Sequence, residues 1–263
     1  MTGREINLGF MSIRHASLRE RVAVAAQAGF DGIALRADRW ADALREGWTL
    51  PRIRALLDEH GQRVSEIEPL RLLRDDLLDA VAEMAPGLGV PRVQVTPPID
   101  GSPLDLAAAA RWLGAAAARL PQVQFAIEFL PPTAVPDAPA ALQLIAQAGG
   151  APNLGLCVDS WHVFRGGGLA SLEGLDPRRV FAIQINDGPL QPTVPDYIDD
   201  CIRFRQPCGA GQFDLHGFLQ RLPADTPVNV EVISEDLDRL PALQVAQLLH
   251  ATTVAALQAA QRR

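Results

Sequence analysis

The chain of 263 residues contains no lysine, so all 24 of its basic residues are arginine. Schiff-base aldolases, pyridoxal-phosphate enzymes and Walker-type P-loop proteins each need a lysine amine. The missing lysine therefore excludes these three classes. Cysteine is also scarce: Cys157, Cys201 and Cys208 are irregularly spaced, which indicates neither a disulfide framework nor a structural zinc site.

Long apolar runs are absent as well. No stretch approaches the ~20 residues that are needed to span a bilayer. Residues 1–7 contain no apolar run of the kind that forms a signal peptide. The net charge of −7 disfavours binding to nucleic acid. From these absences we expect a cytoplasmic protein that acts neither on membranes nor on nucleic acid.

Strand-like and helix-like segments alternate along the whole chain. We expect strands at residues 6–13, 32–36, 63–69, 92–97, 124–129, 154–159, 181–187 and 228–233. We expect helices at residues 17–28, 49–60, 75–85, 103–119, 137–148, 169–174, 213–222 and 240–261. This alternation, without a break in composition, predicts an α/β chain with one (β/α)8 TIM barrel domain over residues 1–263. A doubly wound open sheet fits less well, because its strands are apolar on both faces.

The last four expected strands each carry a metal-binding side chain among apolar residues. Alternate residues of a strand face opposite sides, and here one face is bulky while the other is small or polar. Buried carboxylates are costly unless they are paired or bind a metal. Four oxygen donors in phase, near the C-terminal ends of consecutive strands, therefore predict one divalent-metal site at the barrel mouth. The predicted ligands are Glu128, Asp159, Gln184 and Glu231.

The types of donor in this set indicate which metal would bind. Carboxylate and amide oxygens suit Mn²⁺, Mg²⁺ or Co²⁺ better than structural zinc. Asn186 shares a strand face with Gln184 and is the alternative ligand. His162 follows Asp159 by three residues. It is a candidate ligand or acid–base group, because the ordinary pKa of histidine lies near neutrality.

Further side chains are candidates for contact with a substrate. The longest irregular stretch, residues 188–211, follows the seventh strand and carries Arg203 and Arg205 as candidate anion-binding groups. Trp161, next to His162, is a candidate wall of the substrate pocket, with simple packing as its alternative.

The third strand offers two more acidic candidates. Glu66 and Glu68 share one of its faces, and a buried pair with Arg36 is the alternative to substrate contact for either of them. We select Glu66 as the substrate-binding candidate. The remaining histidines lie in or near expected helices, where a structural role is the simpler interpretation.

Five segments in the second half of the chain resemble the xylose-isomerase-like barrels, which include sugar-phosphate isomerases, epimerases and endonuclease IV. These segments lie at residues 127–128, 158–162, 184–188, 209–214 and 231–232. The resemblance implies that Glu128, Asp159 and Glu231 bind the metal and that His162 assists proton transfer. Glu128, His162 and Glu231 are therefore the catalytic candidates. Endonuclease IV is a poor match, because its three zinc ions need many histidines and this chain has five.

The seventh strand departs from the isomerase pattern. Those enzymes usually have His-x-x-Asp where this chain has Gln184-Ile185-Asn186-Asp187. With a glutamine at this position, the chain resembles the bacterial 3-dehydroshikimate dehydratases, which use a similar set of Glu, Asp, Gln and Glu residues. Residues 203–207 also resemble a dehydratase segment whose arginine binds the substrate carboxylate.

The two enzyme classes share a first step, in which a proton leaves the carbon next to a carbonyl and a metal stabilises the enolate. We therefore predict a metal-dependent sugar or sugar-phosphate isomerase or epimerase that acts on a small polyhydroxylated carbonyl compound. A lyase of the dehydratase type is the alternative. A non-catalytic binding or accessory subunit is the third candidate, because Gly209-Ala210-Gly211 stands where relatives often have Gly-Glu-Gly. The expected partner is the small-molecule substrate, and a homodimer is left open.

Overall fold

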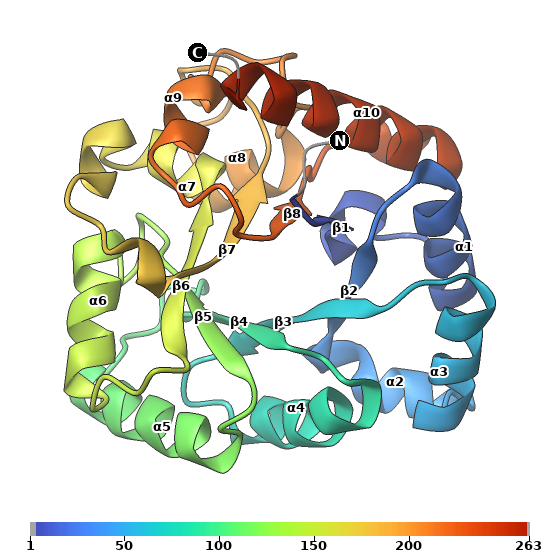
Figure 1. The fold of residues 1–263 in the computed structure, drawn as a ribbon. Coiled ribbons are helices and arrows are strands. Elements are labelled where there is room, and N and C mark those ends of the chain that lie inside the picture. The colour runs from blue at the N-terminus through green and yellow to red at the C-terminus, as the bar shows by residue number, and fades with distance from the viewer. Residues whose placement is uncertain (1–3, 262–263) are drawn as a thin grey trace.

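The computed structural model describes residues 4–261, in which eight parallel strands form a closed barrel in the order of the sequence (Figure 1). Each strand pairs with the next, and the last pairs with the first. The predicted (β/α)8 TIM barrel is therefore confirmed. The strands are β1 (Ile6–Leu8), β2 (Gly32–Arg36), β3 (Val64–Arg71), β4 (Arg92–Thr96), β5 (Gln124–Glu128), β6 (Leu154–Asp159), β7 (Val180–Ile185) and β8 (Val228–Val230).

The helices form a ring around the barrel (Figure 1). Several begin at a residue whose side chain caps the helix: Ser17, Thr49 and Asp137 each accept a hydrogen bond from a backbone N–H of the first turn. The α-helices are α1 (Leu18–Ala28), α2 (Trp40–Arg45), α3 (Leu50–Glu59), α4 (Asp75–Leu88), α5 (Leu106–Arg119), α6 (Ala138–Gln147), α7 (Ser160–Arg165), α8 (Tyr197–Arg203), α9 (Leu215–Gln220) and α10 (Ala242–Gln261).

Three predicted elements differ clearly from the structure, and one of them is the last strand, which ends at Val230 rather than at residue 233. The first strand ends at Leu8 rather than at residue 13, because Phe10–Ile13 form a 3₁₀ helix. There the N–H of Phe10 donates to the carboxylate of Glu68 instead of a neighbouring strand. The helix predicted over residues 169–174 is also wrong, since Gly168–Leu172 form a 3₁₀ helix.

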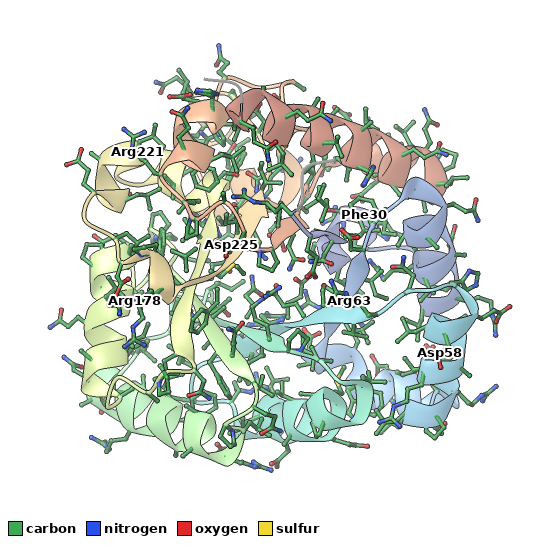
Figure 2. All side chains as sticks on the ribbon, in the orientation of Figure 1. Phe30, Asp58, Arg63, Arg178, Arg221 and Asp225 are labelled. Atoms are coloured by element: carbon green, nitrogen blue, oxygen red, sulfur yellow. The ribbon has the colours of Figure 1, made fainter. Side chains whose placement is uncertain are left out.

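The strands separate bulky and small side chains as their alternation predicts. Phe125, Ile127 and Val158 belong to the main apolar core, and side chains fill the space between strands and helices (Figure 2). On the opposite strand face, Ala126, Cys157 and Ala182 form a separate buried cluster. Cys157 is therefore a buried residue that fills space inside the barrel. Because these side chains are small, there is room for polar groups inside the barrel at its C-terminal end.

The inside of the barrel also holds a buried ion pair. The Nε of Arg92 lies 2.7 Å from Oε2 of Glu66, and both side chains are almost fully buried. Asn229 donates to the other carboxylate oxygen of Glu66 at 2.6 Å. Each charge is therefore compensated within the protein. Within the described part of the chain, no helix is both long and apolar enough to cross a membrane.

Candidate metal centre

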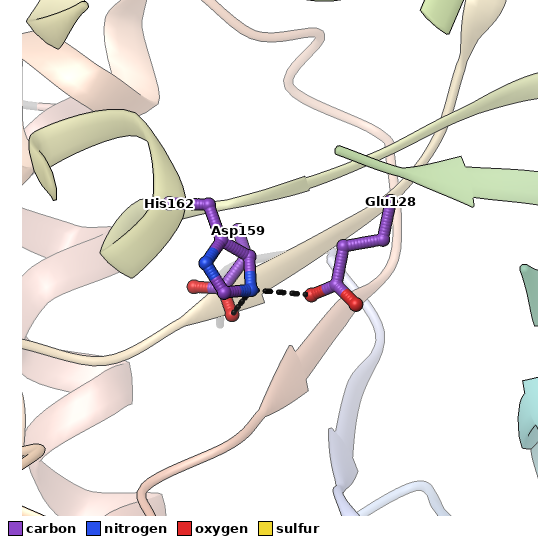
Figure 3. A group of neighbouring side chains, drawn as sticks. All are labelled: Glu128, Asp159 and His162. Atoms are coloured by element: carbon purple, nitrogen blue, oxygen red, sulfur yellow. Dashed lines mark ion pairs between the residues drawn. The ribbon is translucent and has the colours of Figure 1, made fainter. Parts of the chain in front are cut away.

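Three potential metal ligands meet where β5 and β6 end. Glu128 is the last residue of β5 and Asp159 is the last residue of β6, while His162 lies in α7, which begins directly after β6. Asp159 also caps this helix, because its Oδ1 accepts the N–H of Trp161 at 2.8 Å. The helix carries the imidazole of His162 back towards the two carboxylates (Figure 3).

The distances within this cluster are short. The Nε2 atom of His162 lies 3.1 Å from Oε1 of Glu128 and 3.6 Å from Oδ2 of Asp159 (Figure 3). One donor atom from each of the three residues lies within 4.8 Å of the other two, and all three side chains are buried. Two carboxylates and one imidazole in this arrangement form a candidate site for a cation.

Burial makes the charged state of this cluster costly. Desolvation, followed by the nearby Asp159, raises the pKa of Glu128 well above its ordinary value. Desolvation lowers the pKa of His162 to about 4, so the imidazole is neutral near pH 7. Asp159 is paired with the buried Arg205, but beside a neutral imidazole an ionised Glu128 has no cationic partner among the described residues to balance it. A divalent cation would supply that balance, and a neutral imidazole is the form that binds metals.

Gln184 lies at the same level of the barrel as Asp159, its partner in the register of β6 and β7. Its side chain is fully buried, and neither amide atom has a hydrogen-bond partner within residues 4–261. The Oε1 atom of Glu128 also accepts no hydrogen bond there. Unsatisfied buried polar atoms are rare and often mark the place of an ion or water. These residues therefore fit a divalent metal, although the predicted set of four ligands stays a prediction.

Glu231 is connected to the cluster through Arg205. The Nη1 atom of Arg205 donates to Oδ2 of Asp159 at 2.8 Å and to Oε2 of Glu231 at 2.9 Å. Its Nε and Nη2 atoms bind the backbone oxygen and the sulfur of Cys201. Every nitrogen of the Arg205 guanidinium is thus engaged by the protein. Burial raises the pKa of Glu231 to about 7, even though the charge of Arg205 opposes this shift.

A cavity of about 130 Å³ opens beside the cluster. It brings together some of the predicted site residues with others that the sequence did not select. Its polar lining residues include Glu128, His162, Glu231, Arg205, Arg36, Glu68, Arg71, Gln94 and Thr96. Glu68, rather than Glu66, is the acidic residue of β3 that reaches this cavity.

Three predicted substrate-binding residues lie away from the cavity lining. Glu66 binds Arg92 and Asn229 inside the barrel. Trp161 is fully buried and packs against Phe213 at a centroid distance of 5.8 Å. Arg203 forms ion pairs with Asp199 and Glu235. Contact between these three residues and a substrate remains a prediction.

Tyr197 is a site residue that sequence reasoning missed. It is the only tyrosine of the chain, and its hydroxyl lies 2.5 Å from Nδ1 of His162. Burial raises the pKa of Tyr197, so the hydroxyl stays protonated. The contact fixes the orientation of the imidazole ring and leaves Nε2 facing the carboxylates. The absence of other tyrosines from the chain was the one available signal.

Replacing Tyr197 with phenylalanine is expected to weaken Mn²⁺ binding by about 10- to 100-fold, the usual cost of losing a partner that orients a metal-binding histidine. The ring that packs beside His162 is retained, so the melting temperature should change little. Titration of the protein with Mn²⁺, with the free ion followed by electron paramagnetic resonance, measures the effect. An unchanged affinity would show that the hydroxyl does not position His162 for a metal.

Comparisons with known structures show the same barrel fold. The fold is similar to the IolI protein crystallised with a zinc atom, with a TM-score of 0.85 at 19% identity over 98% of this chain and 100% of that one. A xylose isomerase domain protein from Alicyclobacillus acidocaldarius gives a TM-score of 0.80 at 22% identity, over 98% of this chain and 99% of the other.

A third similar structure is the probable 3-DHS dehydratase AsbF from Bacillus anthracis. Its TM-score is 0.75 at 16% identity, over 95% of this chain and 98% of that chain. No curated protein sequence matches the chain. A family model described as xylose isomerase-like TIM barrel does match, over residues 22–252, which confirms the resemblance that the motifs predicted. The chain therefore belongs to the xylose isomerase-like TIM barrel family.

Proposed function

We propose that this chain is a divalent-metal-dependent enzyme that enolises a small polyhydroxylated carbonyl compound, as a sugar isomerase or epimerase. The observation that carries this proposal is the meeting of Glu128, Asp159 and His162 beside a cavity whose wall also contains Glu231. Buried carboxylates beside a neutral imidazole would be costly if they served packing alone.

Glu231 has two tasks in this proposal, as an oxygen donor to the cation and as the group that exchanges a proton with the substrate. A divalent cation held by Glu128, Asp159 and His162, with Gln184 and Glu231 as further oxygen donors, would polarise the substrate carbonyl as a Lewis acid. Glu231 lines the cavity, and its pKa of about 7 suits a group that takes up and returns a proton near neutral pH. Arg205 holds the Glu231 carboxylate in place through Nη1.

One observation favours the lyase as a second candidate. Gln184, at the seventh-strand position where isomerases usually have histidine, is buried level with Asp159 and has an unpaired amide. The fold is also similar to the probable dehydratase AsbF. In a lyase the same proton abstraction would be followed by loss of a hydroxyl group from the β-carbon.

The two candidates predict different products from the Mn²⁺-loaded protein. An isomerase or epimerase should incorporate deuterium from D₂O into the carbon skeleton of its sugar product. A dehydratase should convert 3-dehydroshikimate into an ultraviolet-absorbing aromatic product. Mg²⁺, Co²⁺ and Zn²⁺ should be tested beside Mn²⁺, because the neighbour IolI was crystallised with zinc. Turnover of neither substrate class with any of these metals would contradict the proposed enolisation.

Replacing Glu231 with glutamine is expected to abolish turnover, since the amide cannot exchange a proton with the substrate. The matched control is Glu235→Gln, because Glu235 is half-exposed and pairs with Arg203 away from the cavity lining. The kcat of both variants on the identified substrate is the measurement. Full activity of Glu231→Gln would remove the proposed catalytic role of Glu231.

A further inference from the structure

The proposed function leaves one charged group of the cavity without a task. Arg71 is the last residue of β3, and it lines both the cavity beside the metal cluster and a neighbouring hollow of about 480 Å³. Arg71 therefore stands at the junction of the two spaces. A ligand that fills the first cavity and extends towards the second can therefore contact Arg71.

The guanidinium of Arg71 has no hydrogen-bond or ion-pair partner among the residues that the structure describes, although the residue is half-buried. Most other arginines of the described chain have such partners, and the exceptions Arg19, Arg54 and Arg111 are exposed. Leaving a partly buried cation without a protein partner is unfavourable unless water or an anion from outside the chain binds it.

Two carboxylates that interact with the charge of Arg71 do not supply that anion. Arg71 lowers the pKa of Asp38 and of Asp100 from a distance, but each of these groups is committed elsewhere. Asp38 binds Arg36 through both oxygens, at 2.8 and 2.5 Å. Asp100 accepts hydrogen bonds from the backbone and the hydroxyl of Ser102. The charge of Arg71 is therefore available to a ligand.

The backbone holds Arg71 in a fixed place. Arg71 pairs with Thr96 in the register of β3 and β4. The backbone carbonyl of Arg71 accepts a hydrogen bond from the N–H of Arg74 at 3.2 Å. The intervening Leu73 has a φ of 65°, which is rare for a leucine and confines the tight connection to α4. Glu68 is a second polar residue that lines the same cavity. The Oε2 atom of its buried side chain has no hydrogen-bond partner within residues 4–261.

The other arginines of the cavity cannot take the same role. Arg205 is used by Asp159, Glu231 and Cys201, and Arg36 is paired with Asp38. On the basis of the proposed function, we propose that Arg71 is the subsite for a carboxylate group on the substrate, at the opposite end from the carbonyl. The substrate is then a polyhydroxylated carbonyl compound that is also a carboxylic acid.

A carboxylate suits this subsite better than a phosphate. One guanidinium can bind a carboxylate through two parallel hydrogen bonds. A phosphate has more oxygens to satisfy and usually meets several donors, such as a helix N-terminus or further cations. The nearby Arg74 supplies no second free cation, because both oxygens of Asp76 bind it.

Shikimate and its methyl ester are matched probes, because they differ in the carboxylate alone. Calorimetric titration of the Mn²⁺-loaded wild type is expected to show about 10- to 100-fold tighter binding of shikimate, the range for a charge-assisted hydrogen bond. Arg71→Gln should lose this preference by weakening shikimate binding alone. Arg71→Lys should keep part of the preference, and the control Arg74→Gln should keep all of it.

Each contrary result overturns the proposal. Wild type that binds the acid no more tightly than the ester has no carboxylate subsite. Equal weakening of both probes by Arg71→Gln would mean that Arg71 only shapes the cavity. Tighter binding of ribose 5-phosphate than of shikimate, lost in Arg71→Gln, would assign the subsite to phosphate. A separate titration of the wild type with Mn²⁺, without any probe, tests the proposed function itself. Absence of Mn²⁺ binding in that titration would contradict the proposed function.

Discussion

Glutamine in place of Glu128 is expected to weaken Mn²⁺ binding by more than about 100-fold, because even an outer partner of a metal ligand contributes about 10- to 100-fold. The metal-free variant should at the same time be more stable than the metal-free wild type. Burial and the nearby Asp159 raise the pKa of Glu128, so its ionised form is unfavourable in the folded chain. The neutral amide removes that penalty and still offers an oxygen to the amide of Gln94, which now donates to Glu128 at 2.9 Å.

The stability effect should depend on pH in a defined direction. Below a pH of about 4 the carboxyl group is protonated in both the folded and the unfolded chain, so the variant gains nothing. As the pH rises above that value, the unfolded chain releases the proton first, and the wild type loses stability that the variant keeps. Near pH 8 the expected gain in the free energy of unfolding is about 1 to 3 kcal/mol.

Urea unfolding in the presence of a chelator measures this gain, and titration with Mn²⁺ measures the loss of binding. Glu235→Gln is again the control: it removes an exposed carboxylate and should change neither quantity by much. Wild-type Mn²⁺ affinity in Glu128→Gln would place the ion elsewhere. Lower stability of the metal-free variant would mean that Glu128 serves the packing of the barrel instead of a ligand.

Glu128 and Asp159 could be predicted because the evidence for them is local. A strand repeats every two residues, so the positions of Ala126 and Cys157 determine which face Glu128 and Asp159 occupy. The closed barrel then brings the ends of β5 and β6 together. Nothing beyond the alternation of side chains and the order of strands was needed, and the cluster that includes His162 follows from it.

The choice between Glu66 and Glu68 could not be made in the same way. Both residues lie on one face of β3, and a step of two residues moves about 6.6 Å along a strand. That step separates the buried ion pair of Glu66 from the cavity wall at Glu68. The level of the cavity depends on the register between strands, which shifts between Ile67 and Leu70. Pro69 marks an irregularity there, but a proline alone does not give the size of the shift.

The helix that carries Tyr197 was hidden for a similar reason. The segment Tyr197–Arg203 has seven residues, and its isoleucines and aspartates are mediocre helix formers. Contacts from elsewhere stabilise it: Arg165 of α7 binds Asp200 at 2.8 Å, with both side chains almost fully buried. Arg205 is likewise engaged by residues far away in the sequence, Asp159 and Glu231, whereas Arg71 has no such partner within residues 4–261. The sequence alone could therefore not show which of these arginines is available to a ligand.

Replacing Arg92 with methionine is expected to lower the free energy of unfolding by about 3 to 5 kcal/mol, the typical cost of removing one partner of a buried ion pair. The carboxylate of Glu66 would then stay fully buried with Asn229 as its remaining hydrogen-bond donor. The carbonyl oxygen of Phe181 would also lose the hydrogen bond that it accepts from Arg92 at 3.1 Å. Urea unfolding, followed by tryptophan fluorescence and by circular dichroism, measures the loss.

The double variant Arg92→Met/Glu66→Gln separates the two roles that Glu66 can have. It removes both charges and keeps an oxygen that can accept the hydrogen bond of Asn229, so about half or more of the lost stability should return. Because Glu66 does not line the cavity, the double variant should have the Mn²⁺ affinity and turnover of the wild type. Recovered stability with lost turnover would instead support the sequence-based prediction that Glu66 contacts the substrate. Recovered stability together with wild-type turnover would mean that Glu66 acts only in the interior of the barrel.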